Sequence, residues 1–154
     1  RLEPDVTTEV VARNVRLKAT VVTEDEKETS GLRTILNYGH TIGHGIEAAA
    51  GFDSYLHGEA VAIGMIGASR LGNKMGITPE YLISLQQDLL RKFGLPDRAE
   101  GVTRGQVLAA MTRDKKNELG QVNWVFLEAV GSARTYRGVP LDDIGRTLFD
   151  LGIN

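Results

Sequence analysis

LRTILNYGHTIGHGIE (residues 32–47) and, after a short turn-like segment, LHGEAVAIGM (residues 56–65) are the stretches that decide the fold. Apolar side chains in the first stretch recur at helical spacing, whereas the second stretch is apolar nearly all round, as in a buried helix. We therefore predict two helices, over residues 32–50 and 57–75, with Gly51 and Gly76 directly after their ends.

A polar stripe follows the first of these helices. It combines one cation, one amide, two imidazoles and one acid, namely Arg33, Asn37, His40, His44 and Glu47. A solvated helix face more often carries Lys and Glu, so this stripe is a candidate binding surface. Gly39, Gly43 and Gly45 interrupt the same helix, and each costs about 1 kcal/mol relative to Ala in a helix interior. We therefore expect another backbone or a ligand to approach this helix closely.

The three histidines of the chain all lie between residues 40 and 57. His40 and His44 share a helix face, and the turn-like segment before His57 would bring a third imidazole towards them. His57 stands at a helix N-terminus, where the helix dipole disfavours imidazolium and keeps the ring able to ligate. Neutral imidazoles suit Zn²⁺, although an HxxxH pair alone is more often a pair of ordinary histidines. Thr41 stands where a zinc metalloprotease has its Glu, which excludes the HExxH class.

The remaining sequence predicts a mainly α domain with one small β-hairpin. Helices are expected over residues 7–23, from Pro79 to Gly94, over 103–114 and from Pro140 onward. The hairpin is expected from residues 122–128 and 133–139, and residues 24–31 form a polar loop. We treat residues 1–154 as a single helical domain, and because the chain starts at Arg1, not Met, with residues typical of a turn between elements, we expect it to be part of a longer protein.

Composition excludes several classes of protein. The chain has 154 residues, of which 42% are hydrophobic, so one core can form. Its net charge of −2 excludes a basic footprint for nucleic acid or a polybasic membrane surface, and no apolar run is long enough to cross a bilayer. The absence of Cys excludes disulfides and thiolate metal ligands. We expect a cytoplasmic protein with neither nucleic acid nor membrane as partner.

The two motifs resemble 3-dehydroquinate synthase, within the sugar phosphate cyclases. The resemblance rests on RxxLNxGHTxGHxIE at residues 33–47 and HGExVxxGM at residues 57–65, and it extends to residues 18–19, 25–28 and 114–116. It implies the C-terminal helical metal and substrate domain, with the NAD-binding α/β domain in an N-terminal part outside this chain. It also implies a lyase of the shikimate pathway, which makes 3-dehydroquinate and phosphate from 3-deoxy-D-arabino-heptulosonate 7-phosphate for chorismate and aromatic amino acid biosynthesis.

The resemblance also implies roles for metal-binding and catalytic residues. His40 and His57 match two ligands of Zn²⁺ or Co²⁺, and the third ligand of the family is a Glu upstream of this chain. His44 matches a catalytic histidine near the substrate phosphate, and Glu28 matches a proton acceptor. The family usually has one residue fewer between this Glu and Arg33.

Substrate-binding residues follow from the same resemblance. Lys18 and Arg33 match the pair that binds the substrate carboxylate, and Arg can contact a carboxylate through two parallel hydrogen bonds. Asn37 matches a phosphate contact, as does one of Lys115 and Lys116, of which we favour Lys115. From the residues alone, a lysine on the apolar face of a helix more often covers that face, and a lysine pair after a helix is more often a solvated charge run.

Three other functions remain open. Cyclases that make 2-epi-5-epi-valiolone share the architecture, but their substrate has no carboxylate and does not need Lys18 and Arg33. Iron-type alcohol dehydrogenases are a more distant resemblance, and a non-catalytic helical metal-binding module is the third possibility. The resemblance further implies a homodimer in the full enzyme. For this chain alone we expect weak zinc binding, no tight NAD⁺ binding and no turnover.

Overall fold

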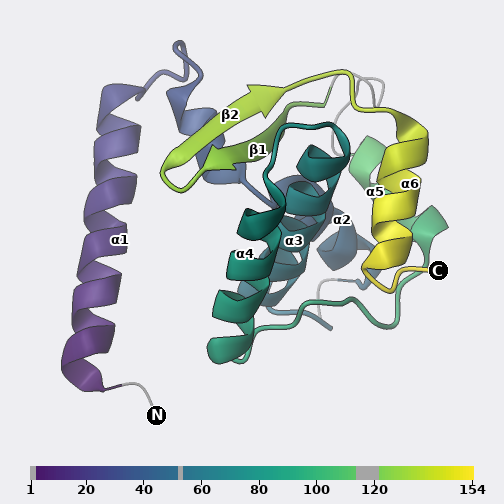
Figure 1. Ribbon diagram of the computed structural model, residues 1–154, viewed down its shortest axis with the longest axis horizontal. Helices are drawn as coiled ribbons and strands as arrows, with labels where there is room; N and C mark the ends of the chain where they lie inside the picture. The colour runs from purple at the N-terminus through teal and green to yellow at the C-terminus, as the bar shows by residue number, and fades with distance from the viewer. Residues whose placement is uncertain (1–2, 52–53, 114–121) are drawn as a thin grey trace. The chain divides into compact units, whose positions relative to one another are not determined.

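The computed structural model describes residues 3–51, 54–113 and 122–154, and it is mainly helical with one two-stranded hairpin, as predicted (Figure 1). The chain forms two compact units, one ending at Leu36 and one beginning at Asn37, and each is described by itself. None of the helices in the described ranges is both long and apolar enough to cross a membrane.

The first unit consists of α1 (Pro4–Glu24), a loop, and most of the 3-10 helix η1 (Leu32–Asn37). The predicted helix over residues 7–23 is confirmed and starts three residues earlier. Pro4 fits this start because proline lacks the N–H that the first turn of a helix leaves unpaired. The helix buries none of its own residues within its unit.

The predicted single helix over residues 32–50 is wrong in its first half. The chain forms η1, turns at Gly39, and only then forms α2 (His40–Ala49). Gly39 has a φ of +79°, in the left-handed region that glycine adopts most readily. As a result, the predicted polar stripe does not follow one helix: Arg33 and Asn37 lie on η1, and the other three residues lie on α2.

Glycines allow α2 to pack tightly against its neighbours, as predicted. A Cβ built on Gly43 would lie 3.1 Å from Val61 Cα in α3 (His57–Lys74), and one on Gly64 would meet the carbonyl oxygen of Gly39. On the other side of α2, a Cβ on Gly45 would lie 2.8 Å from the Met111 side chain in α5 (Arg104–Arg113). The position of α2 is therefore set by backbone contact with α3 and by the side chains of α5.

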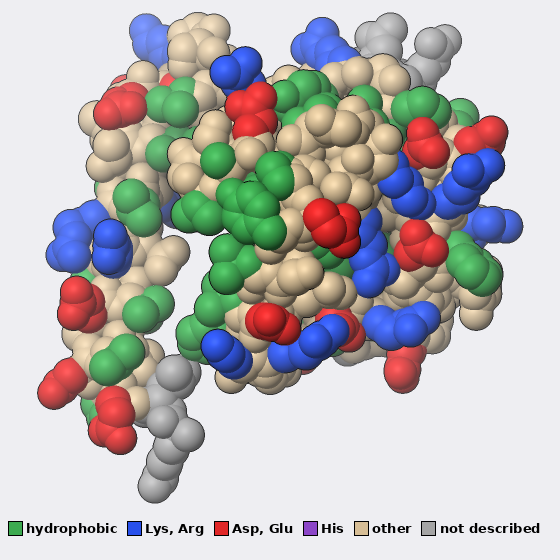
Figure 2. All heavy atoms as spheres, viewed as in Figure 1, with side chains coloured by type: hydrophobic (Ala, Val, Ile, Leu, Met, Phe, Trp, Pro, Cys, Tyr) green, Lys and Arg blue, Asp and Glu red, His purple; other side chains and the backbone are tan. Residues whose placement is uncertain are grey.

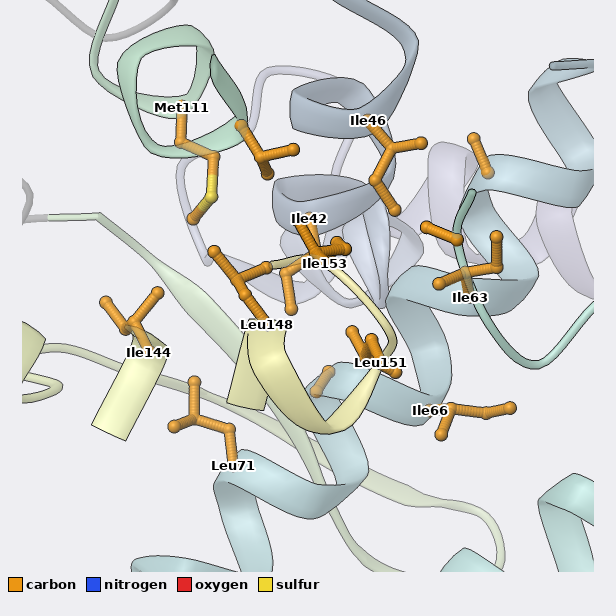
Figure 3. Packing of buried hydrophobic residues seen from close by; sticks show 14 of the residues in the cluster. Ile42, Ile46, Ile63, Ile66, Leu71, Met111, Ile144, Leu148, Leu151 and Ile153 are labelled. Carbon is orange, nitrogen blue, oxygen red and sulfur yellow. The ribbon is translucent and has the colours of Figure 1, made fainter. Parts of the chain in front are cut away.

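The core of the second unit lies around α3, which is buried along most of its length. Side chains from α2, α3, α5, α6 (Leu141–Asp150) and the C-terminal residues meet there, as Figure 3 shows. The largest fully buried side chains include Ile42, Ile46, Ile63, Ile66, Leu71, Ile144, Leu148, Leu151 and Ile153. This aliphatic core holds α2 and the first turn of α3 in place.

The hairpin and the fourth helix also contribute to this core, through Trp124, Phe126 and Leu90. β1 (Trp124–Ala129) and β2 (Ser132–Tyr136) form the predicted antiparallel hairpin, with an irregular register after Leu127. The fourth helix, α4 (Glu80–Lys92), begins after Pro79, which precedes its first turn with an extended backbone instead of belonging to it. On the face of this unit that Figure 2 shows, acidic and basic side chains lie interspersed, in keeping with the small net charge.

Candidate functional site

Three imidazoles lie close together near the N-terminal ends of α2 and α3. His40 and His44 lie one turn apart on α2, and His57 is the first residue of α3. The ring centroids are 5.2 Å apart for His40 and His44, 5.3 Å for His40 and His57, and 5.7 Å for His44 and His57. One ligating atom from each residue lies within 4.8 Å of the others. The expectation that His57 returns to the HxxxH pair is confirmed.

Hydrogen bonds distinguish the three rings. Nδ1 of His40 lies 3.1 Å from the backbone oxygen of Tyr38, and Nδ1 of His57 lies 3.1 and 3.2 Å from the two carboxylate oxygens of Glu47. Because these oxygens accept hydrogen bonds, Nδ1 of each ring carries a proton, and in the neutral ring Nε2 keeps its lone pair. Within the described ranges, His44 makes no such bond. His40 and His57 therefore each have a hydrogen-bond partner at Nδ1, whereas His44 has none among the described residues.

The environment favours the neutral form of His40. Burial lowers its pKa, the imidazoles of His44 and His57 add to this effect, and the hydrogen bond to the Tyr38 carbonyl opposes it. A metal ion requires neutral imidazole, and nitrogen donors without thiolate fit Zn²⁺ or Co²⁺. The donor set of the cluster therefore fits the divalent cation that the sequence predicts.

Tyr38 fixes the segment that directly precedes α2. Its hydroxyl lies 2.6 Å from Ser69 Oγ and 3.0 Å from Gln86 Nε2, and it donates to the Met65 carbonyl at 3.1 Å. Burial raises the pKa of this phenol, so the hydroxyl remains a donor. Since the carbonyl of the same residue contacts His40, the orientation of that imidazole depends on side chains of α3 and α4.

The loop of the first unit brings two other predicted site residues together. Nε of Arg33 lies 3.1 Å from Glu28 Oε1. The loop is closed by Asp25, which is buried and accepts hydrogen bonds from the amides of Thr29, Ser30 and Arg33 at 2.8, 3.0 and 3.1 Å. These bonds, with that from the Ser30 amide first in effect, lower the pKa of Asp25 to about 2.

The remaining predicted residues are less constrained. Lys18 is exposed on α1, Asn37 is exposed at the end of η1, and Lys115 lies outside the described residues. Sequence reasoning gave no role to Asp25, and it placed Glu47 on the polar stripe without a partner. The available signals were weak: Asp25 directly follows a helix, and Glu47 lies three residues after His44, a candidate catalytic histidine.

Two solved structures of sugar phosphate cyclases share this fold. A 2-deoxy-scyllo-inosose synthase in complex with carbaglucose-6-phosphate, NAD⁺ and Co²⁺ matches with a TM-score of 0.82 and 29% identity, over 97% of this chain and 42% of that one. The 2-epi-5-epi-valiolone synthase of Streptomyces hygroscopicus, with NAD⁺ and Zn²⁺ bound, matches with a TM-score of 0.80 over 97% of this chain and 41% of its own. At 24% identity, the second match supports the fold alone.

Sequence relatives identify the family. The 3-dehydroquinate synthase of Methylacidiphilum infernorum is 42% identical over 135 residues, which are 88% of this chain and 38% of the relative. That of Caldanaerobacter subterraneus is 44% identical over 131 residues, which are 85% of this chain and 36% of the relative. This chain spans about two fifths of the length of these relatives. Residues 1–117 match the family described as 3-dehydroquinate synthase C-terminal, and the chain belongs to that family.

Proposed function

We propose that this chain is the metal- and substrate-binding part of a 3-dehydroquinate synthase, a phosphorus-oxygen lyase that converts 3-deoxy-D-arabino-heptulosonate 7-phosphate to 3-dehydroquinate and phosphate. The observation that carries the proposal is the cluster of His40, His44 and His57 in a chain of this family. An N-terminal domain would bind most of the NAD⁺, and the complete enzyme would act as a homodimer in the cytoplasm. The lack of Cys suits that reducing compartment.

His40 and His57 would bind the metal ion through Nε2, because Nδ1 of each ring already has a hydrogen-bond partner. Zn²⁺ or Co²⁺ would polarise the substrate hydroxyls that lose protons, and a third ligand would come from the N-terminal part. His44 would bind near the substrate phosphate and exchange a proton at a ring nitrogen. The proposal thus separates two ligands from one acid–base group.

The other proposed site residues would bind the two anionic groups of the substrate, its carboxylate and its phosphate. Arg33 and Lys18 would bind the carboxylate, and Asn37 and Lys115 would bind the phosphate. Glu28 would accept a proton from the substrate, and its ion pair with Arg33 supports a role beside the group proposed to bind the carboxylate. NAD⁺ would supply transient oxidation of one carbinol, which no side chain of this chain can perform.

A valiolone-type cyclase is the second candidate, because the 2-deoxy-scyllo-inosose synthase of 29% identity is a structural match with another specificity. The identity of 42% to a 3-dehydroquinate synthase, against 29% to that cyclase, weighs against it. So do Lys18 and Arg33, which a substrate without a carboxylate does not need. A helical metal-binding module without catalysis would retain the cluster but give no product in any assembled enzyme.

Product identification tests the substrate. The chain would be produced as one polypeptide with an NAD-binding domain of the family and offered the heptulosonate phosphate or a heptulose phosphate without a carboxylate. We expect 3-dehydroquinate from the first, and Arg33→Ala to lower kcat/KM by at least about 100-fold, the effect of a lost charged contact. Arg146→Ala, at an exposed residue of α6, is the control. Product from the uncharged substrate alone would instead identify a valiolone-type cyclase.

Calorimetric titration with Zn²⁺ tests the metal site in this chain. We expect weak binding, because two imidazoles leave a tetrahedral site incomplete. His40→Ala should abolish it, whereas His44→Ala should retain most of it, since His44 is assigned to proton exchange. An isotherm unchanged by His40→Ala would remove this residue as a ligand.

A further inference from the structure

Glu47 is a mostly buried acid beside an exposed imidazole. Its side chain is 12% exposed, whereas that of His57 is 58% exposed. Both carboxylate oxygens lie within hydrogen-bonding distance of His57 Nδ1, at 3.1 and 3.2 Å. Within the described part of the chain, this imidazole is the one hydrogen-bonding partner of the carboxylate.

The position of Glu47 is electrostatically unfavourable for the helix that carries it. It lies in the last turn of α2, where the carbonyl end of the helix dipole disfavours a negative charge, and that turn has no basic residue. Removing a carboxylate from water also costs free energy unless a strong partner compensates. Helix stability therefore does not explain an acid at this position, and the contact with His57 does.

His57 needs an external group to fix its ring. It is the first residue of α3, and more than half of its side chain is exposed, so packing alone leaves the ring free to rotate. The two oxygens of Glu47 hold Nδ1 as the protonated nitrogen and direct the ring. The equivalent group for His40 is the fixed backbone carbonyl of Tyr38. The two proposed ligands are therefore oriented in the same way, one by the backbone and one by a side chain.

We propose that Glu47 is a positioning residue, which holds His57 in the Nδ1–H tautomer so that Nε2 is available to a divalent cation. It acts through His57 and does not contact the metal ion. This inference rests on the proposed metal centre, but its effect on the tautomer exists before any metal binds. Partners of this kind typically change metal affinity 10–100-fold when they are removed.

The first experiment measures Zn²⁺ affinity of the 154-residue chain by competition with a chelating dye. Glu47→Ala should weaken binding about 10–100-fold, and Glu47→Gln, whose amide oxygen still accepts a hydrogen bond, should weaken it less. Glu80→Gln removes an exposed acid of α4 and serves as the control with unchanged affinity. In a His44→Ala background, which should retain most of the binding, Glu47→Ala should cause the same loss, because the carboxylate acts through His57 and not through His44. A folded Glu47→Ala chain with affinity within about twofold of the original would overturn the proposal.

The second experiment keeps the inference testable whether or not the chain binds metal. Imidazole ¹⁵N shifts of the metal-free chain should place the His57 proton on Nδ1, and Glu47→Gln should shift the population towards the Nε2–H tautomer. His40, held by a carbonyl, should not change. A His57 proton on Nε2 in the unsubstituted chain would refute the positioning role. Absence of zinc binding with the expected tautomer would instead contradict the proposed metal centre alone.

Discussion

The imidazole cluster of the second unit and the loop of the first unit place their functional side chains in different ways. In the cluster, the histidines stand on helices that touch through glycine backbones and share an aliphatic core. In the loop, Glu28 and Arg33 are arranged by one buried carboxylate, that of Asp25. The first arrangement depends on the stability of the whole unit, whereas the second depends on a few local hydrogen bonds. Substitutions should therefore separate the two.

Gly64→Ala should have the largest effect, because it acts on the packing beneath the cluster. The added Cβ would meet the Gly39 carbonyl oxygen and lie 2.8 Å from Gly43 N, and backbone cannot rotate away as a side chain can. We expect a loss of about 3 kcal/mol in the free energy of unfolding, as for severe overpacking. Urea denaturation measures the loss, and ring-current shifts of the three histidines report the separation of α2 from α3.

Gly145→Ala is the matched control, since a Cβ at this helical glycine of α6 meets nothing within 4 Å. It should stabilise the chain by up to about 1 kcal/mol through helix propensity. Equal effects of the two substitutions would contradict the view that backbone contact between α2 and α3 places the histidines.

The same packing explains why the fold could be predicted only in part. The spacing of His40 and His44 and the apolar character of α3 are local properties, and both elements could be predicted from them. The turn at Gly39 could not, because the group that excludes a side chain there is distant in sequence: the backbone nitrogen of Met65 would lie 2.7 Å from a Cβ built on this glycine. A helical pattern of apolar residues continues across this turn, and so the prediction of one helix over residues 32–50 failed.

The candidate site was predictable to a similar extent. The histidine cluster could be predicted from residue type and position, since all three histidines of the chain lie between residues 40 and 57. Asp25 and Glu47 carry no comparable signal, because acids are common at exposed positions and only burial sets these two apart. Partners of functional residues depend on the tertiary structure, which a single sequence does not contain.

Asp25 should give the loop a pH dependence in the acid range. Its pKa falls from 3.8 to about 2 in the folded chain, chiefly through the amide of Ser30 and then that of Arg33. A lowered pKa means that the ionised carboxylate stabilises the loop above about pH 4, and that this stabilisation is lost as the pH falls through about 2. Amide shifts of Thr29, Ser30 and Arg33 should therefore titrate together with a midpoint near pH 2.

Asp25→Asn provides the comparison for this titration. It should abolish the shared midpoint and speed hydrogen exchange of the three amides at neutral pH, while amides of α3 keep their protection. A midpoint near 3.8 in the original chain would show that the three amides do not stabilise the carboxylate. Faster exchange in α3 would show that the loop and the helical core are not separable.

Glu28→Gly should give the smallest change in stability, and its comparison with Glu28→Ala tests whether the backbone at this residue is strained. Glu28 has a φ of +53°, a left-handed conformation that costs a residue with a Cβ about 1 kcal/mol. Its ion pair with Arg33 is exposed and contributes about 0.5 kcal/mol. Glycine relieves the strain but loses the pair and gains freedom in the unfolded chain, so we expect the free energy of unfolding to change by no more than about 0.5 kcal/mol in urea denaturation. Glu28→Ala, which loses the pair and keeps the strain, should destabilise instead. Loss of activity in the assembled enzyme with both variants would show that the carboxylate, which both remove, serves the chemistry of the loop; a Glu28→Gly chain less stable than the Glu28→Ala chain would contradict the expected strain at this residue.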